Sequence, residues 1–111
     1  MKTISVPNSL EAMMRLDYNC CNEGDLSEYQ LSNEYFDLLQ EIGFFDSLNK
    51  NLNLMISEYE DEIISVSKIE SALKIVEEYK VKFLLYRDLF FEIERLMLLA
   101  YEKKTGFLLF F

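Results

Sequence analysis

Apolar and polar residues follow regular spacings along much of the chain, and these spacings predict its elements. Residues 2–6 alternate between apolar and polar side chains, which predicts a short strand that Pro7 ends. Asn8 and Glu11 have the spacing of a capping box, which predicts that a short helix begins there. Residues 17–28 carry no such pattern, and we expect an irregular loop.

A helical spacing of apolar residues follows this loop. Ser32 stands where it can cap a helix, and Gly43 is placed to end it. Residues 44–59 also have apolar positions that suit a helix, although the three asparagines among them favour it less.

The second half of the chain predicts two longer helices. Ser67 and Glu70 form a second capping box at the start of the first. One unbroken helix over 68–104 would be about 55 Å long, which exceeds a small domain, so we expect a turn near residues 79–82. The last helix then runs to about residue 104, with Gly106 as its C-cap.

This last helix has apolar residues on two sides. Its main apolar face consists of Leu85, Leu89, Ile93, Leu96 and Ala100, widened by Tyr86, Phe90 and Met97. On the opposite side, Leu84, Phe91 and Leu98 recur every seven residues among charged side chains. We expect the chain itself to cover both sides. A contact with a second copy or another partner through Leu84, Phe91 and Leu98 is the alternative.

The last residues, FLLFF, predict a closing strand that pairs with residues 3–6, with an exposed edge as the alternative. The expected fold is mainly α with a small β element (α+β). It has four to five helices and paired short strands at the two ends. The chain has 111 residues, half of them apolar, so we expect one domain over residues 1–111.

No segment of the sequence predicts membrane insertion or export. The N-terminus has no continuous apolar region of the kind found in signal peptides. The most apolar window, residues 81–100, contains six charged residues, which excludes an ordinary membrane span. Cys20 and Cys21 are adjacent, and we expect two reduced thiols rather than a disulfide framework. The expected location is the cytoplasm.

The residue types needed for catalysis are sparse. The chain has no histidine, so acid–base chemistry would depend on carboxylates, tyrosines or a thiolate. Asp88 and Glu92 share a helix face, but Arg95 lies on it too, which favours a charged strip. The run EYEDE lacks the alternating oxygens and the glycine of an EF-hand. We therefore expect no enzyme activity, no metal and no cofactor.

Charge is unevenly distributed along the chain. The net charge is −9; residues 1–62 hold 13 acids and 3 bases, whereas residues 63–111 hold 7 acids and 8 bases. This distribution disfavours direct binding of nucleic acid, which needs clustered lysine and arginine. The acids serve either solubility or the attraction of a basic protein. The candidate partner-binding residues are Asp17, Tyr18, Glu23, Asp25, Glu28, Tyr29, Glu34, Glu58, Glu60, Asp61 and Glu62.

A small acidic chain with tyrosines among its carboxylates resembles bacterial toxin-neutralising immunity proteins, including those of contact-dependent inhibition and other polymorphic toxin systems. The tail AYEKKTGFLLFF is similar to that of small bacterial proteins found beside such toxins. The resemblance implies a stoichiometric inhibitor that binds a basic toxin, with a nuclease domain as the expected target. The alternatives are an acidic nucleic-acid mimic of phage or plasmid origin and an oligomerising adaptor module.

Overall fold

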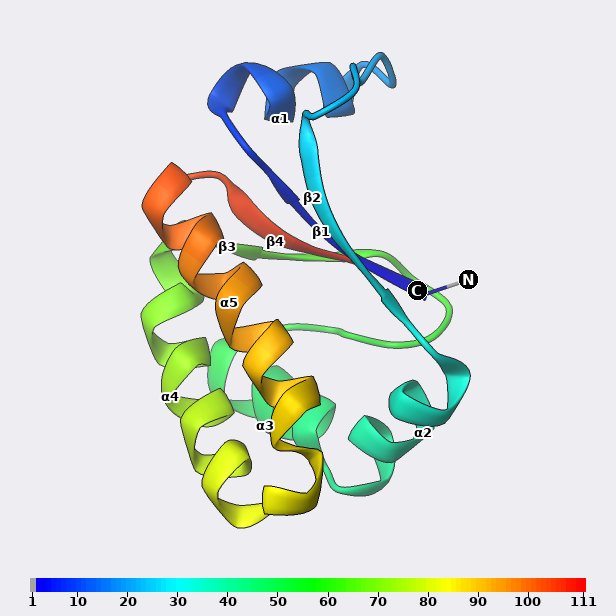
Figure 1. Ribbon diagram of the computed structural model, residues 1–111, viewed down its shortest axis with the longest axis vertical. Coiled ribbons are helices and arrows are strands. Elements are labelled where there is room, and N and C mark those ends of the chain that lie inside the picture. Colours follow the sequence, from blue (N-terminus) through cyan, green and yellow to red (C-terminus); the bar gives the residue numbers. More distant parts are fainter. Residues whose placement is uncertain (1) are drawn as a thin grey trace.

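The two ends of the chain meet as neighbouring strands in an antiparallel sheet. The computed structural model describes residues 2–111 and is shown in Figure 1. Strand β1 (Lys2–Pro7) pairs with strand β4 (Gly106–Phe110), and Thr3 lies opposite Phe110. This register confirms the prediction that the terminal strands pair.

Two further strands form the edges of the sheet, and the sequence patterns did not predict them. In the described residues the order is β2–β1–β4–β3, where β2 is Leu26–Leu31 and β3 is Glu62–Ser65. The prediction of a loop up to residue 28 is therefore wrong at its end. Strand β2 pairs with β1 along its whole length, and that long-range pairing leaves no clear pattern in the local sequence.

Five helices lie in the described part of the chain, so the predicted α+β class with four to five helices is confirmed. They are α1 (Leu10–Asp17), α2 (Asn33–Glu41), α3 (Phe44–Leu52), α4 (Val66–Lys82) and α5 (Arg87–Lys103). Helix α3 is shorter than the predicted 44–59, because Asn53 adopts a left-handed conformation with φ of 55° and ends it. Within residues 2–111, no helix is long and apolar enough to cross a membrane.

The helices form one layer against the sheet. Helices α4 and α5 pack on each other and on the sheet, and α3 packs on α4. Figure 1 shows α3, α4 and α5 gathered on one side, with α1 apart at the far end of strands β1 and β2. Phe90 is fully buried where these helices meet, with its ring centroid 5.4 Å from that of Phe44. The Tyr79 hydroxyl donates to the Gly43 carbonyl at 3.1 Å and ties α4 to the start of α3.

The helix starts agree with the predictions at one position and differ at two. The Ser32 hydroxyl accepts the Tyr35 N–H at 3.1 Å, which confirms the cap of α2. Helix α1 is capped by Ser9 rather than by Asn8. Helix α4 begins at Val66, so Ser67 lies inside its first turn and caps nothing. In both cases the chain starts its helix within two residues of the predicted cap.

One helix end agrees with its prediction, and two differ from theirs. Gly43 has φ of +82° and ends α2, as predicted. Helix α4 continues through Lys82, slightly beyond the expected turn, and a 3₁₀ turn over residues 84–86 leads into α5. Lys104, not Gly106, takes the left-handed C-cap of α5, with φ of 58°. Gly106 instead starts β4, where an added Cβ would lie 3.0 Å from Ile63 Cδ1.

The apolar residues of α5 are divided sharply between the core and the surface. Leu89, Phe90, Ile93, Leu96, Met97 and Ala100 are buried, as predicted. Leu85 was assigned to the same face but is exposed, because it lies in the 3₁₀ turn before the helix. Leu84, Phe91 and Leu98 are also exposed, so the prediction that the chain covers them is wrong. The helices of the chain form a single layer, which buries only one side of α5.

Candidate functional site

The sheet has an outer face that points away from the helix layer. Successive side chains of a strand point to opposite faces, and Ile4 and Val6 of β1 belong to the core. Their neighbours therefore lie on the outer face, and the strand register extends this assignment to the other strands. We define the outer face as Thr3, Ser5, Glu28, Gln30, Asp61, Ile63, Leu108 and Phe110.

Apolar side chains occupy the part of the outer face that β4 and edge strand β3 form. Ile63 is 39% exposed and Phe110 is partly exposed, whereas Leu108, which lies opposite Ile63, is buried. With Asp61 and Glu62 they line a shallow hollow of about 190 Å³. The Ile63 side chain lies over Gly106, and the absence of a Cβ at this glycine makes the close packing of β3 on β4 possible. The arrangement offers a small apolar surface that a partner can cover.

Carboxylates lie at the two margins of this face. Glu28 is on edge strand β2, and its Oε2 accepts the hydroxyl of the fully buried Ser5 at 3.1 Å. Asp61 lies at the opposite margin, directly before β3. The two edges are three strand spacings apart, about 14 Å. The sheet order thus brings Glu28 and Asp61 to opposite margins of the outer face.

The turn before β3 holds the remaining acids of that run. Glu58 and Glu60 are exposed, and a β-bridge between Ser57 and Glu60 closes the turn. Glu62 is partly buried and accepts the Met55 N–H at 2.8 Å. Glu62 therefore supports the local backbone, whereas Glu58 and Glu60 remain free to meet a partner.

Asp25 is part of the fold rather than of an open surface. It is 7% exposed, and its two oxygens accept bonds from Arg15 Nε and Nη2, both at 2.7 Å. The Asn22 backbone N–H donates to it at 2.8 Å. The Arg15 guanidinium and then the Asn22 N–H lower the pKa of Asp25 to about 2. Asp25 thus fastens the loop after α1 and is not available to a partner.

The other residues predicted at this end of the molecule are exposed. Asp17 is the last residue of α1, and Tyr18 follows it with its side chain in solvent. Glu23 lies in the turn that leads back to β2. They lie beyond the end of the sheet that is opposite Asp61, since β2 runs away from them toward Leu31. The predicted acidic set is therefore spread over both ends of the sheet rather than gathered at one point.

Tyr29 faces the opposite side of the sheet from Glu28. It lies opposite Ile4 and packs against the core, and burial raises the pKa of its phenol. The adjacent residues Glu28 and Tyr29 therefore cannot form one contact surface. The alternation of side chains along a strand separates them.

A second group of acids and tyrosines lies on α2. Glu34, which was predicted, lines a shallow hollow of about 380 Å³ together with Tyr35, Asp37, Leu38, Glu41 and Tyr86. Asp37 and Glu41 were not among the predicted residues. Their spacing from Glu34, at three and seven residues, places all three carboxylates on one helix side, and this signal could have identified them.

These exposed carboxylates have no cation partner in the described residues. Between residues 2 and 111, the ion pairs use Asp25, Glu77, Glu92 and Glu94. The acids without a lysine or arginine within 4.0 Å include Asp17, Glu23, Glu28, Glu34, Asp37, Glu41, Glu58, Glu60 and Asp61. Their charge is available to attract a basic surface.

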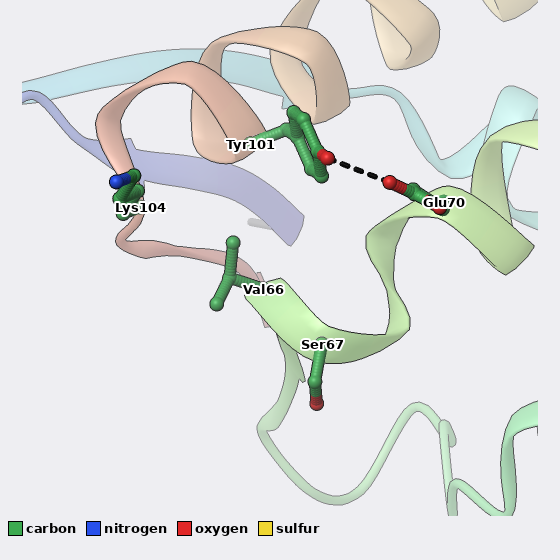
Figure 2. Close-up of a pocket in the computed structure, with 5 residues that line it drawn as sticks. All are labelled: Val66, Ser67, Glu70, Tyr101 and Lys104. Atoms are coloured by element: carbon green, nitrogen blue, oxygen red, sulfur yellow. Dashed lines mark hydrogen bonds between the residues drawn. The ribbon is translucent and has the colours of Figure 1, made fainter.

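A separate hollow of about 460 Å³ lies between the start of α4 and the end of α5 (Figure 2). Figure 2 shows Tyr101 and Glu70 pointing toward each other, and the Tyr101 hydroxyl donates to Glu70 at 2.6 Å. This bond raises the pKa of Tyr101. The Ser67 hydroxyl lies 3.0 Å from that of Ser65 rather than near a base. The polar groups of this hollow therefore hold two helix ends together.

Comparison with family models, with curated proteins and with solved structures finds no match for this chain. Fold and surface alone define the class: an α+β protein with a helix layer on one side of its sheet. The other side carries apolar side chains between free carboxylates. Such a surface suits the docking of a protein with basic side chains.

Proposed function

We propose that this chain is an immunity-type inhibitor that neutralises a basic toxin by binding it through the outer face. One observation carries the proposal: Glu28 and Asp61 have no ion-pair partner among the described residues and lie at opposite margins of the outer face, where Ile63 and Phe110 line an apolar hollow beside Asp61. The resemblance of the sequence to immunity proteins supports the same reading.

The two kinds of side chain contribute differently to binding. Apolar and aromatic residues at the centre of an interface supply most of the binding energy once water is excluded. Charged residues at the rim mainly raise the association rate and select partners of opposite charge. Ile63 and Phe110 take the first role. Glu28 and Asp61 take the second, helped by the free Glu58 and Glu60.

The expected target is a nuclease domain, because nucleases hold the phosphate backbone with clustered lysine and arginine. Carboxylates at the outer face compete for the same cations, so the inhibitor either covers the active site or docks beside it. Such inhibition requires no catalytic group in the inhibitor.

The geometry gives less support to nucleic-acid mimicry. A mimic needs carboxylates at spacings that match the phosphates, which follow one another about every 3.4 Å of helix axis along each DNA strand. Glu28 and Asp61 instead lie at opposite edges of the sheet, which are about 14 Å apart, and Leu108 and Phe110 of β4 lie between these edges. A compact patch of this kind suits one protein partner.

The proposal is tested by co-expression with the toxic C-terminal domain of a secreted protein encoded beside this chain. We expect growth to be restored and the purified pair to bind one to one, as measured by calorimetry. Failure to protect against that toxin, or protection without binding, would refute the proposal.

Matched charge reversals then test the surface. Glu28→Lys and Asp61→Lys should slow association and weaken its dependence on salt, as measured by surface plasmon resonance. Glu78→Lys on α4 makes the same change of charge at an exposed position of the helix layer and should leave the rate nearly unchanged. Equal effects of all three variants would show that net charge acts and not the outer face.

A further inference from the structure

The 3₁₀ turn before α5 and the exposed side of α5 carry a stripe of apolar residues that lies apart from the outer face. Leu84, Phe91 and Leu98 are 51–65% exposed, and Val81 at the end of α4 lies next to them. Val81, Leu84 and Phe91 line a hollow of about 430 Å³ with Lys80, Arg87 and Asp88. Monomeric proteins in water rarely leave neighbouring large apolar side chains this exposed.

We propose that this stripe binds a second copy of the chain in an antiparallel twofold contact centred on Phe91. In such a contact Phe91 meets its own counterpart, and Leu84 lies opposite Leu98 of the second copy. All three stripe residues are then covered at once. The proposal concerns the helix layer and does not depend on the proposed inhibitor function.

The charges beside the stripe fit this arrangement. At 100° per residue, Arg87 and Glu94 lie on one side of the line through Phe91, and Asp88 and Arg95 lie on the other side. A twofold axis perpendicular to the helices reverses their direction and brings equal sides together. A residue before Phe91 therefore meets a residue of the second copy that comes after Phe91 on the same side of the helix.

This reversal places opposite charges against each other. Arg87 lies four residues before Phe91 and Glu94 lies three residues after it, so Arg87 meets Glu94 of the second copy. Asp88 meets Arg95 of the second copy by the same reasoning. With the two reciprocal pairs, these four residues form four pairs of opposite charge across the contact.

Two of these four residues already have an ion pair within one chain: Glu94 pairs with Lys80, and Arg95 pairs with Glu92 at 2.8 Å, so its contact with Asp88 of the second copy is an additional one. Lys80 Nζ lies 3.0 Å from both Glu77 and Glu94, so this cluster keeps one net negative charge that Arg87 of the second copy can neutralise. Among residues 2–111, Arg87 and Asp88 have no ion pair of their own.

Charge also disfavours other surfaces for self-association. Residues 1–62 carry a net charge of −10, from 13 acids and 3 bases, so two copies repel through the surfaces that they form. Residues 63–111 carry 7 acids and 8 bases, and two copies can approach through them without that repulsion.

Light scattering and sedimentation of the purified chain test the proposal. We expect a mass of twice the 13.2 kDa of one chain. Phe91→Glu should raise the dissociation constant about thirtyfold or more, the effect of losing a buried aromatic anchor. Met14→Glu is the matched control, because Met14 on α1 is also 60% exposed, and this variant should remain dimeric.

A charge swap supplies a second test that leaves the apolar residues in place. Asp88→Arg should weaken the dimer about tenfold, and Asp88→Arg combined with Arg95→Asp should restore it. Circular dichroism confirms that each variant is folded, and Leu98→Lys replaces Phe91→Glu if that variant is not. A wild-type chain that stays monomeric up to millimolar concentration would overturn the proposal, as would a Phe91→Glu dimer of wild-type affinity.

Discussion

Two adjacent phenylalanines on α5 provide a direct test of the fold. Phe90 is fully buried and contacts the rings of Phe44 and Tyr79, whereas Phe91, rotated by about 100° around the helix, is 60% exposed. Phe90→Ala and Phe91→Ala make the same chemical change one position apart. Differences in helix propensity are therefore the same for both, and only the surroundings of the two rings differ.

The expected costs follow from burial. Truncating a buried phenylalanine to alanine costs about 3–5 kcal/mol, because transfer free energy is lost and a cavity remains. Truncating an exposed one changes stability by at most about 0.5 kcal/mol. A chain of 111 residues has a total stability of about 6–17 kcal/mol, so Phe90→Ala removes a large part of it.

Urea unfolding followed by circular dichroism measures both variants, at a concentration at which the chain is monomeric. With a slope of about 2 kcal/mol per molar urea, Phe90→Ala should lower the midpoint by about 1.5–2.5 M, and Phe91→Ala should leave it nearly unchanged. Similar costs for the two variants, or a cost of Phe90→Ala below about 1 kcal/mol, would refute the assignment of the two faces of α5.

Three further substitutions test local features of the structure. Asp25→Asn should be less stable than the wild type at neutral pH, and this difference should disappear as the pH falls from 3.8 toward about 2. The reason is that Arg15 lowers the pKa of the Asp25 carboxyl in the folded protein, and the carboxylate no longer stabilises the fold once it is protonated. A gap in urea stability that is constant over this window would contradict that role. Ser9→Ala should cost about 1 kcal/mol by thermal unfolding, because Ser9 caps α1, and Ser67→Ala should cost almost nothing, because Ser67 lies inside the first turn of α4. A larger cost for Ser67→Ala than for Ser9→Ala would contradict these assignments. Gly43→Ala should cost about 1–2 kcal/mol, since φ of +82° suits glycine, and an unchanged melting temperature would contradict this backbone conformation.

Local patterns in the sequence predicted the elements that do not depend on distant partners. The Ser32 cap and the Gly43 terminator bound a helix found within a residue of its predicted limits. The buried face of α5 followed from helical spacing, apart from Leu85 before the helix begins. These signals involve residues within one or two helical turns of each other, so the sequence reveals them without knowledge of the tertiary structure.

The edge strands could not be predicted in the same way. The β2 segment LSEYQL and the β3 segment EIIS are short, and neither has a strong alternation. Each becomes a strand because β1 or β4 supplies backbone hydrogen bonds, and these partners lie far away in the sequence. The local pattern of either segment therefore does not identify a strand.

The residues of the candidate site were also predicted in part from the sequence and determined in part by the tertiary structure. Sequence alone determined that the first half of the chain is strongly acidic and that apolar residues lie on two sides of the last helix, because these are properties of composition and spacing. Only the tertiary structure separated Glu28 from Tyr29, buried Asp25 against Arg15, and brought Glu28 and Asp61 to one face. It also left Phe91 uncovered. The physical reason is that strand pairing and helix packing join residues far apart in the chain, and no local pattern records which side of an element they will cover.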